Sequence, residues 1–366
     1  MVTTFIYGPG LYKEFFDDEI DYNSYEGYPT QVIVGSNVIH IREYAFQDIS
    51  LALCVTDEDS ELETIGEHAF SGTNLAEFIL PNSVTHIGNH AFEKCKNLTH
   101  FDISFNSQLE RIGDYAFYDT PIYSTFVPDS IRYIGDYAFA KTNVLIHRFP
   151  NKLINIGAHA FEETMILVLI LGESIEYIGE YAFHNASLLI QIHFLGNKLI
   201  NIGAYAFEGT KVSVLTLPSS LSFIGEFAFN NINTLTTLTI PETSQLKTIE
   251  RYAFHNTSIN SLTLPNSVEY IGSYAFYNTN IPIINLGTNL RTIEDHAFYN
   301  TDISNFTLHT DIDKIGPRAF PHSNILLVSH TNNDSILITR EMFDENAYRN
   351  LLNIYNFTKY NERFLN

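Results

Sequence analysis

The side chains that could do chemistry are numerous, but they follow a single spacing. The 366 residues include 14 His and 42 acidic residues, and four of the His stand two residues before a recurring Phe. These four are His68, His90, His159 and His296; seven Tyr take the same position in other repeats. Planar side chains alternating at one position predict a stacked, half-exposed ridge. A metal site needs converging ligands, which this spacing does not provide, and nothing further supports pH sensing.

Motifs of known catalytic chemistry are missing from the sequence. It has no Gly-rich phosphate loop, no nucleophile elbow and no paired Cys motif. The acidic run 57–61 could bind a cation weakly, but a solvated surface loop is the better explanation. Cys54 and Cys95 are too few for a disulfide scaffold and are compatible with a reducing compartment. We therefore expect a non-enzymatic protein without a cofactor or a metal.

The net charge disfavours several kinds of partner. Twenty Lys and Arg stand against 42 acids, a formal net charge of -22 at pH 7. Nucleic acid and anionic membranes both attract basic surfaces, so neither is expected to bind. The N-terminal residues do not read as a secretory signal, and no apolar run is long enough to span a bilayer. We expect no membrane insertion, a monomer or weak homo-oligomer, and a place in the cytoplasm, including a host cytoplasm, or in a virion.

A repeated phrase must position all of these residues. An Ala-Phe pair occurs thirteen times at intervals of 22–25 residues, and each Phe follows an Ile by five residues. The thirteen are Phe46, Phe70, Phe92, Phe117, Phe139, Phe161, Phe183, Phe207, Phe229, Phe254, Phe276, Phe298 and Phe320. A fixed period of this length predicts stacked units that share one continuous core.

Residues 257–279 illustrate the expected unit. Leu alternates with polar residues over 262–264, which predicts a short strand, and Pro265 closes it. Gly272 is expected to permit a tight bend. The segment 273–278 is predicted to be a helical turn that buries its Ala-Phe pair. The position three before Phe is acidic in seven repeats, as the dipole at a helix start favours. Stacking should then pair the strands into one long parallel sheet.

The unit reads L-x-x-L-x-L-P-x-S-V-x-x-I-G-x-Y-A-F-x-x-T, and it resembles the BspA-like, or treponemal-type, leucine-rich repeats. The match runs from Val32 to Ser329; Thr mostly replaces the Cys that ends the family's unit, while Cys95 keeps it. The resemblance implies a right-handed curved solenoid. Known members include bacterial adhesins that bind host matrix proteins, and repeat proteins of protists and large DNA viruses. The Asn-, Ile- and Tyr-rich composition fits the protist or viral group better.

The expected fold class is therefore an α/β repeat solenoid: a right-handed leucine-rich-repeat-like superhelix of about 13 repeats of 22–25 residues, with a concave parallel sheet and short helical turns or irregular segments on the convex side. The repeat intervals recur after 137 residues, which predicts a duplicated six-repeat block. The expected parts are an N-terminal cap at 1–30 (alternatively a partner-binding segment), a solenoid at 31–330 with blocks at about 46–183 and 183–320, and a C-terminal helical cap at 331–366 with its helix over 340–355.

The outward positions of the predicted strands are the candidates for binding a partner. The first half is partly apolar, and the second half is mostly Thr, Asn and Ser, which strand propensity alone also favours. The candidates are Phe126, Ile146, Arg148, Val168, Ile170, His193, Thr216, Thr239, Thr263 and Thr307. An exposed apolar group on a sheet often marks a partner site. We expect a scaffold that binds a protein partner through its concave face; the alternative is a surface- or virion-associated attachment protein that recognises host protein or glycan.

Overall fold

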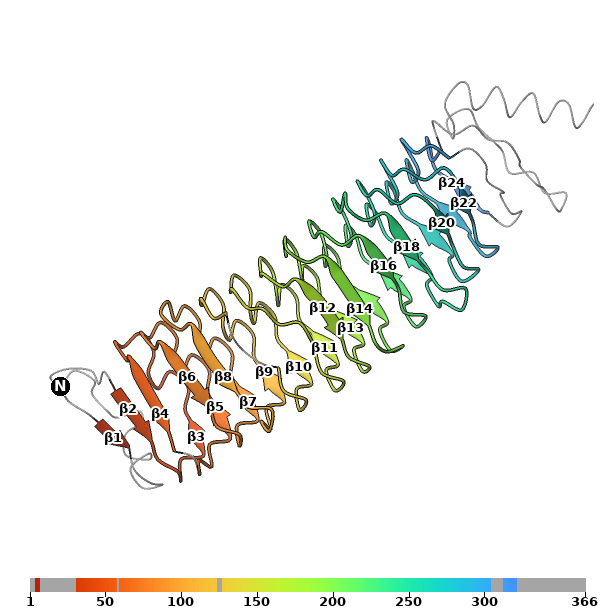
Figure 1. Cartoon of the computed structure of the whole chain (residues 1–366). Helices are drawn as coiled ribbons and strands as arrows, with labels where there is room; N and C mark the ends of the chain where they lie inside the picture. Colours follow the sequence, from red (N-terminus) through yellow and green to blue (C-terminus); the bar gives the residue numbers. More distant parts are fainter. Residues whose placement is uncertain (1–3, 7–30, 58, 124–126, 304–311, 321–366) are drawn as a thin grey trace, which may run out of the picture. The chain divides into compact units, whose positions relative to one another are not determined.

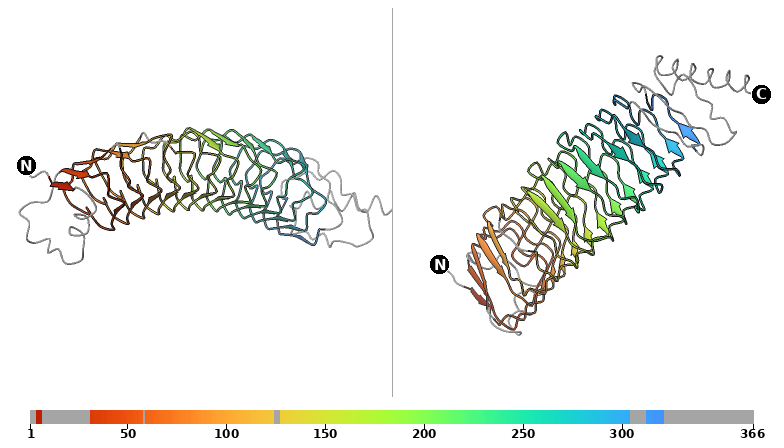
Figure 2. Two further views of the ribbon diagram at one scale, coloured as in Figure 1. Left: turned by 90° about the horizontal axis from the view of Figure 1, so that it is seen from below. Right: turned by 45° about the vertical axis from the view of Figure 1, so that its right-hand side comes forward.

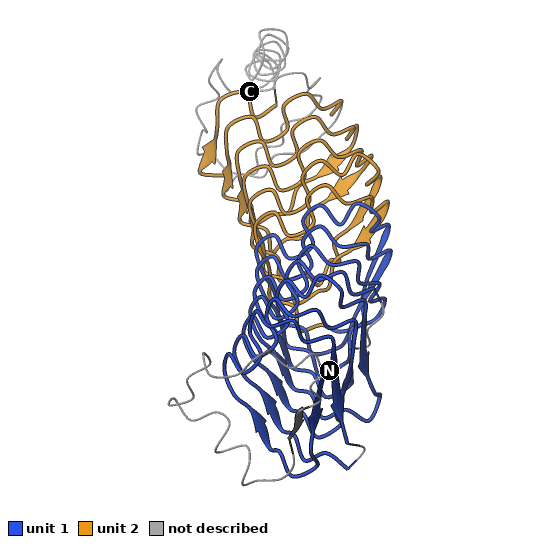
Figure 3. Cartoon of the chain, turned by 90° about the vertical axis from the view of Figure 1, so that its left-hand side faces the viewer, with its two compact units in different colours: residues 1–196 blue, residues 197–366 orange. Residues whose placement is uncertain are grey.

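The computed structural model describes residues 4–6, 31–57, 59–123, 127–303 and 312–320. The chain divides into two compact units, residues 1–196 and 197–366 (Figure 3). Within each unit, successive repeats lie next to one another as rungs (Figure 1, Figure 2). Most of the predicted N-terminal cap, the whole C-terminal cap, Phe126 and Thr307 lie outside the described residues. The boundaries of the caps and the six-repeat duplication stay predictions.

The most regular element is a ladder of two-residue parallel strands that end in the repeat Ile. In unit 1 its strands are β3 (His40–Ile41), β5 (Thr64–Ile65), β7 (His86–Ile87), β9 (Arg111–Ile112), β10 (Tyr133–Ile134), β11 (Asn155–Ile156) and β13 (Tyr177–Ile178). In unit 2 they are β15 (Asn201–Ile202), β17 (Phe223–Ile224), β19 (Thr248–Ile249), β21 (Tyr270–Ile271), β23 (Thr292–Ile293) and β24 (Lys314–Ile315). Within each unit the Ile residues of neighbouring rungs pair in register, as Ile134 does with Ile156 and Ile249 with Ile271. We call this element the Ile ladder.

The Leu-x-Leu strands form short separate sheets instead of the one long sheet predicted. In unit 1 these sheets are β1 (Thr4–Ile6), β2 (Gln31–Val34) and β4 (Leu53–Thr56); β6 (Glu77–Leu80) and β8 (His100–Ile103); and β12 (Val168–Leu171) and β14 (Gln191–Phe194). In unit 2 they are β16 (Val214–Thr216) and β18 (Thr237–Thr239), and β20 (Leu262–Thr263) and β22 (Ile284–Asn285). The step from Ile to Phe is a constant five residues, and all variation in repeat length falls between Phe and the next Ile. This variable part holds the Leu-x-Leu strands, while the Ile ladder stays in register.

The Ala-Phe segments are turns, and no helix occurs among the described residues, so the predicted helical turns are not confirmed. Around Phe161, His159 and Glu163 have φ values of 56° and 57°. The N–H groups of residues 159, 161 and 163 donate to carbonyls of the next rung at 2.8–2.9 Å, while those of 160 and 162 bond within their own turn. A helix would use its backbone donors internally. The alternating turn uses half of them to join rungs, which makes the fold of each unit a parallel β-solenoid.

The repeat Gly and the acidic residue after it have roles that differ from those predicted. Gly157 does not have a positive φ; a Cβ there would lie 2.5 Å from the carbonyl carbon of Gly135 in the preceding rung. The Gly therefore permits close approach of rungs. The acidic position does not begin a helix. The Oδ1 atom of Asp136 accepts the backbone N–H of Ala158, one rung on, at 2.7 Å, and Asp114 does the same for Asp136 at 2.9 Å.

The core is the column of Phe rings that the repeat predicts. In each unit, neighbouring rings stack at centroid distances of 5.0–5.4 Å. In nine repeats the position three after Phe holds a buried Thr or Cys95, as predicted for a small and weakly polar residue. Its hydroxyl satisfies a carbonyl next to the core, since Thr142 Oγ1 donates to the Phe139 carbonyl at 2.7 Å. Every described repeat thus places a Phe in the same core layer.

Candidate functional site

Three predicted site residues lie side by side on the strand face of unit 1, the face formed by the outward side chains of the Leu-x-Leu strands. Arg148 forms an isolated parallel bridge with Ile170, and Ile170 pairs with His193 between β12 and β14. Arg148 and His193 are exposed, and Ile170 and Val168 are partly exposed. Three rungs thus bring four predicted residues onto one surface.

Ile146 does not lie on this surface, and the prediction that its side chain is exposed is wrong. Its side chain is only 4% exposed, whereas that of Leu145 is 46% exposed. No strand forms over residues 144–147, where the chain turns Ile146 into the core and Leu145 outward. The alternation of buried and exposed residues is shifted in this rung. A prediction that takes one outward residue from each repeat cannot detect such a shift.

A larger apolar surface lies in the segments that lead into β12 and β14 and in the corresponding segment of the preceding rung, and it was missed by sequence reasoning. It consists of five side chains that are 41–48% exposed: Leu145, Met165, Leu167, Leu188 and Ile190. We call these five the apolar patch. The Ile190 N–H donates to the Leu167 carbonyl at 3.0 Å, so these two lie on adjacent rungs. Leu145 corresponds to Leu167 by the same 22-residue step that joins Arg148 to Ile170.

The sequence did carry a signal for the apolar patch. Residues 165–171 are seven consecutive apolar residues, and residues 188–190 are three more. A strand that buries one face needs apolar residues only at alternate positions. The surplus residues at the entry to β12 and β14 have no place in the core and remain on the surface.

In unit 2 the predicted row is polar. Thr216 pairs with Thr239 and Thr263 with Asn285, and all four side chains are exposed. The Asn285 amide also donates to Thr263 Oγ1 at 3.4 Å. The row therefore presents hydroxyl and amide groups along the outward strand positions, and strand propensity remains a sufficient explanation for the Thr.

The Tyr and His ridge forms as predicted on the Ala-Phe turns. Neighbouring rings stack at centroid distances of 4.2–5.1 Å in unit 1 and 4.6–4.8 Å in unit 2, where Phe227 joins the row. Most of these rings are partly exposed. Their positive φ values place each one at the same point of its turn. Packing of rung on rung accounts for the alternation of Tyr and His.

Among the described residues, the stacking of rungs brings together one group of side chains that could bind a metal, which the spacing along the sequence does not reveal. Donor atoms of His68, His90 and Glu93 lie within 4.8 Å of one another. However, the two imidazoles are parallel within 8° at 4.4 Å, so their in-plane lone pairs do not converge on one point. Glu93 is already bonded to His90 and Lys94 at 2.8 and 2.7 Å. Burial would raise the pKa of Glu93, but these two hydrogen bonds outweigh it and lower the pKa.

The two cysteines have the character of core residues. Both are free and buried, and burial raises the pKa of Cys54 to about 12 and that of Cys95 to about 11. The Cys95 thiol donates to the Phe70 carbonyl at 3.1 Å. A nucleophilic cysteine needs a lowered pKa and access to solvent. Neither thiol therefore has the environment of a catalytic group.

Among the described residues, no helix has the length and apolar character that crossing a bilayer requires.

Solved structures share the architecture at low sequence identity. A leucine-rich repeat protein from Bacteroides ovatus is 20% identical, with 86% of this chain and 87% of that chain covered and a TM-score of 0.52. The pneumococcal vaccine antigen PcpA is 20% identical over 82% and 79% of the two chains, with a TM-score of 0.43. A leucine-rich cell surface protein from Faecalibacterium prausnitzii is 18% identical over 86% and 93%, with a TM-score of 0.40. None of the curated proteins matches the sequence.

The B. ovatus protein supports the leucine-rich-repeat solenoid fold. Proteins of the leucine-rich repeat family are commonly non-enzymatic scaffolds for protein interactions. The sequence model of the BspA type leucine rich repeat region matches in six copies, over residues 18–146, 110–231 and 200–327. These ranges cover most of the sequence and include the Ile and Ala-Phe residues that the rungs share. The chain belongs to the BspA-type leucine-rich repeat family.

Proposed function

We propose that the protein is a non-enzymatic scaffold that binds a protein partner through the strand face of unit 1, which the sequence predicts to be concave. The observation that carries this proposal is the apolar patch. Large aliphatic side chains gather there on adjacent rungs with nearly half of their surface exposed. Contiguous exposed apolar surface on a soluble protein often marks an interaction site.

The apolar patch has no role in the fold that would explain it. The core of the same rungs is already filled by Leu169, Ile192 and the Phe column, which are buried. Polar residues at the five positions would leave that core intact. Arg148 and His193 add polar groups on the same rungs. An apolar centre with a polar rim is the usual anatomy of a protein interface, in which the centre supplies affinity and the rim supplies specificity.

The polar row of unit 2 is a second proposed contact. Thr216, Thr239 and Thr263 would contribute hydrogen bonds from the outward positions of β16, β18 and β20, and Thr307, outside the described residues, would extend the row. Phe126 remains a proposed contact for unit 1. Hydrogen bonds at an exposed rim contribute little affinity, so we place the main energetic contribution in the apolar patch.

We also propose that the scaffold acts in the cytoplasm of its own or a host cell, or in a virion, as a monomer or weak homo-oligomer. The two free, buried cysteines support a reducing compartment. The attachment role predicted as the alternative requires exposure outside the cell. Fractionation of the native source tests this, because recovery from the outer surface of a cell or particle would favour attachment.

The experiment compares capture of partners by the wild-type chain and by Leu167→Glu/Ile190→Glu. The matched control is Ile79→Glu, since Ile79 lies on β6 of the same unit and is 65% exposed but outside the apolar patch. We expect the double variant to lose the captured protein and the control to keep it, with unchanged far-UV circular dichroism in both. Hydrogen exchange on the complex should show protection over residues 165–171 and 188–194. Equal capture by both variants would place the interface elsewhere.

A further inference from the structure

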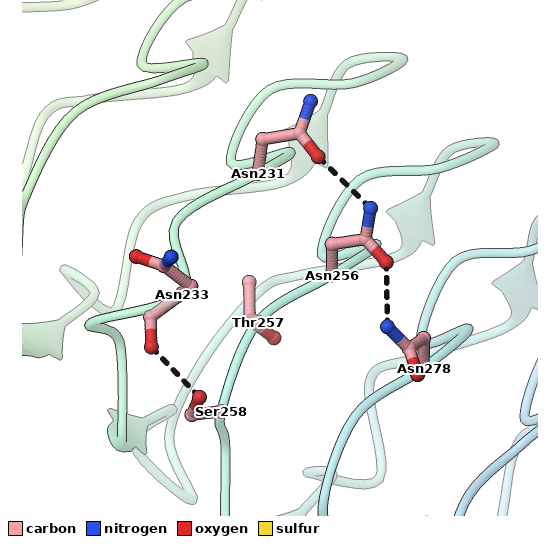
Figure 4. A pocket seen from close by; sticks show the side chains of 6 residues that line it. All are labelled: Asn231, Asn233, Asn256, Thr257, Ser258 and Asn278. Carbon is pink, nitrogen blue, oxygen red and sulfur yellow. Dashed lines mark hydrogen bonds between the residues drawn. The ribbon is translucent and has the colours of Figure 1, made fainter.

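Unit 2 contains a polar groove in the segments that directly follow its Ala-Phe pairs. The groove has a volume of about 410 Å³ and is lined by Asn231, Asn233, Asn256, Thr257, Ser258 and Asn278 (Figure 4). All six lining residues are uncharged, and none is a large apolar residue. Most small-molecule pockets are lined chiefly by apolar side chains. This lining instead suits a neutral ligand that is rich in hydrogen-bonding groups.

One wall of the groove is a ladder of amides that runs from rung to rung. The Asn256 amide donates to Asn231 Oδ1 at 2.9 Å, Asn278 donates to Asn256 at 2.8 Å, and Asn300 donates to Asn278 at 2.7 Å. An amide carries two N–H donors and two acceptor lone pairs. Asn256 and Asn278 each use one donor and one lone pair along the ladder. One donor and one lone pair therefore remain on each of them for a ligand.

Asn233 lies across the groove from this ladder (Figure 4). Its carbonyl accepts the Ser258 hydroxyl at 2.7 Å. Within the described part of the chain, no side chain bonds to the Asn233 amide itself, and the residue is exposed. The groove thus has donors and acceptors on two sides, and the amide on one side is available without breaking a contact of the fold.

The turn geometry does not by itself demand Asn here. Asn231, Asn256 and Asn278 have φ values of 56–58°, a conformation that Asn tolerates well. At the same point of the turn, however, Lys94, Lys141 and other non-Gly residues adopt the same φ in unit 1. The run of Asn therefore adds the amide ladder to a turn that other residues can also form.

In unit 1 an ion pair occupies the positions that correspond to this groove. The 137-residue offset places Lys96 at the position of Asn233 and Asp119 at that of Asn256. There the Lys96 ammonium pairs with the Asp119 carboxylate and also donates to the Asp119 carbonyl at 3.2 Å. An ion pair spans the rungs in unit 1. In unit 2 the same two positions hold neutral amides with no bond between their side chains.

We propose that the Asn groove of unit 2 is a binding site for a neutral carbohydrate. Sugar hydroxyls each donate and accept a hydrogen bond, which complements amides that offer one donor and one lone pair each. The uncharged lining gives no preference for an anion or a cation. The open ladder repeats its amides along the rungs, so it suits successive units of an oligosaccharide better than a single compact metabolite. This site is independent of the protein-binding apolar patch of unit 1.

The test is titration calorimetry on the full chain with three neutral probes: maltohexaose, mannohexaose and chitohexaose. We expect at least one probe to bind saturably at a single site at concentrations up to about 10 mM. Asn233→Ala should weaken that binding about fivefold, or about 1 kcal/mol, because one hydrogen-bonding group is lost outside the ladder. The matched control Lys96→Ala, at the corresponding position of unit 1, should bind as the wild type does.

Three results would overturn the carbohydrate proposal. One is the absence of saturable binding by every probe. Another is an Asn233→Ala variant that binds as tightly as the wild type. The third is an equal loss in Lys96→Ala, since this would trace the effect to general stability. Far-UV circular dichroism of each variant separates loss of binding from unfolding, and Asn278→Ala provides a second groove variant if Asn233→Ala does not fold.

Discussion

Replacing Gly157 by Ala tests how the rungs are held together. An ideal Cβ at Gly157 would lie 2.5 Å from the Gly135 carbonyl carbon, and 2.6 Å from both the backbone nitrogen and Oδ1 of Asp136. Non-bonded carbon atoms prefer separations of about 3.5–4.0 Å. The overlap is therefore about 1 Å, and two of the three atoms belong to backbone. Neither can rotate away as a flexible side chain would.

The expected change in the free energy of unfolding is the balance between contacts that destabilise the folded state and an opposing effect on the unfolded chain. Overpacking of a closely packed site costs about 1–3 kcal/mol. Moving Asp136 also endangers its 2.7 Å hydrogen bond to the Ala158 N–H, a contact worth about 1 kcal/mol. Against this, Gly→Ala restricts the unfolded chain and stabilises by about 0.4–1 kcal/mol. The net expectation is a free energy of unfolding lowered by about 1–3 kcal/mol.

Gly72 provides the contrasting case, because its constraint is conformational. Its φ is 70°, and the first atom that a Cβ would meet is Asp48 Oδ1, the movable end of a side chain. Other repeats place Asn at the same point of the turn, including Asn185 and Asn256 with φ values of 55° and 56°. Gly72→Asn should therefore cost at most about 1 kcal/mol, since Asn tolerates this region. Gly157→Asn should cost at least as much as Gly157→Ala.

The measurement is equilibrium unfolding in urea, followed by far-UV circular dichroism and by Tyr fluorescence, since the chain has 22 Tyr and no Trp. Agreement of the two probes checks whether the transition is cooperative in each variant. If Gly157→Ala unfolded at the wild-type urea concentration, close approach of rungs would not be the role of this Gly. Recovery of stability in Gly157→Asn would point instead to backbone conformation.

The remaining predictions concern the core, the acidic position and one half-buried His. Phe161→Ala should lower the free energy of unfolding by about 3–5 kcal/mol, because the buried ring stacks on both neighbours at 5.2 and 5.4 Å; a loss under about 1 kcal/mol in urea unfolding would contradict this. Asp136→Ala should cost about 0.5–1.5 kcal/mol and Asp136→Asn less, since an amide oxygen also accepts the Ala158 N–H; equal losses in thermal melting would argue against that role. Burial lowers the pKa of His255. As the pH falls below about 6.5, His255 therefore binds a proton in the unfolded chain before it does so in the folded protein, and the free energy of unfolding decreases. His255→Gln should flatten this pH dependence in urea unfolding measured across that range, and an unchanged slope would exclude His255 as its source.

The features that could be predicted from the sequence are those that every repeat shares. The Ala-Phe phrase indicated the stacked Phe column, and the Tyr and His that precede it indicated the stacked ridge. Both follow because residues at equal positions of successive rungs must lie next to one another. The buried Thr position, which Cys95 also occupies, follows for the same reason. The family resemblance rested on the same shared residues, and the matching family model confirms it.

The features that could not be predicted depend on how rungs meet. The helical turn was a reasonable expectation for the segment around Phe161, but the backbone donates to the next rung instead. The exposure of Leu145 in place of Ile146 depends on a local shift in alternation. The stacking of His68 on His90 and the amide ladder at Asn256 join residues that are 22 or more positions apart, so no local motif reveals them.

The sequence by itself determined the period, the composition of the core and the family, because a repeated unit must bury the same side chains in every copy. Only the tertiary structure decided which strand forms the continuous ladder, what the turns are, and which outward residues gather into surfaces. The physical reason is that hydrogen bonds between rungs, and not those within a repeat, satisfy much of the backbone. The apolar patch and the Asn groove both lie between Phe and the next Ile, the part of the repeat whose length varies.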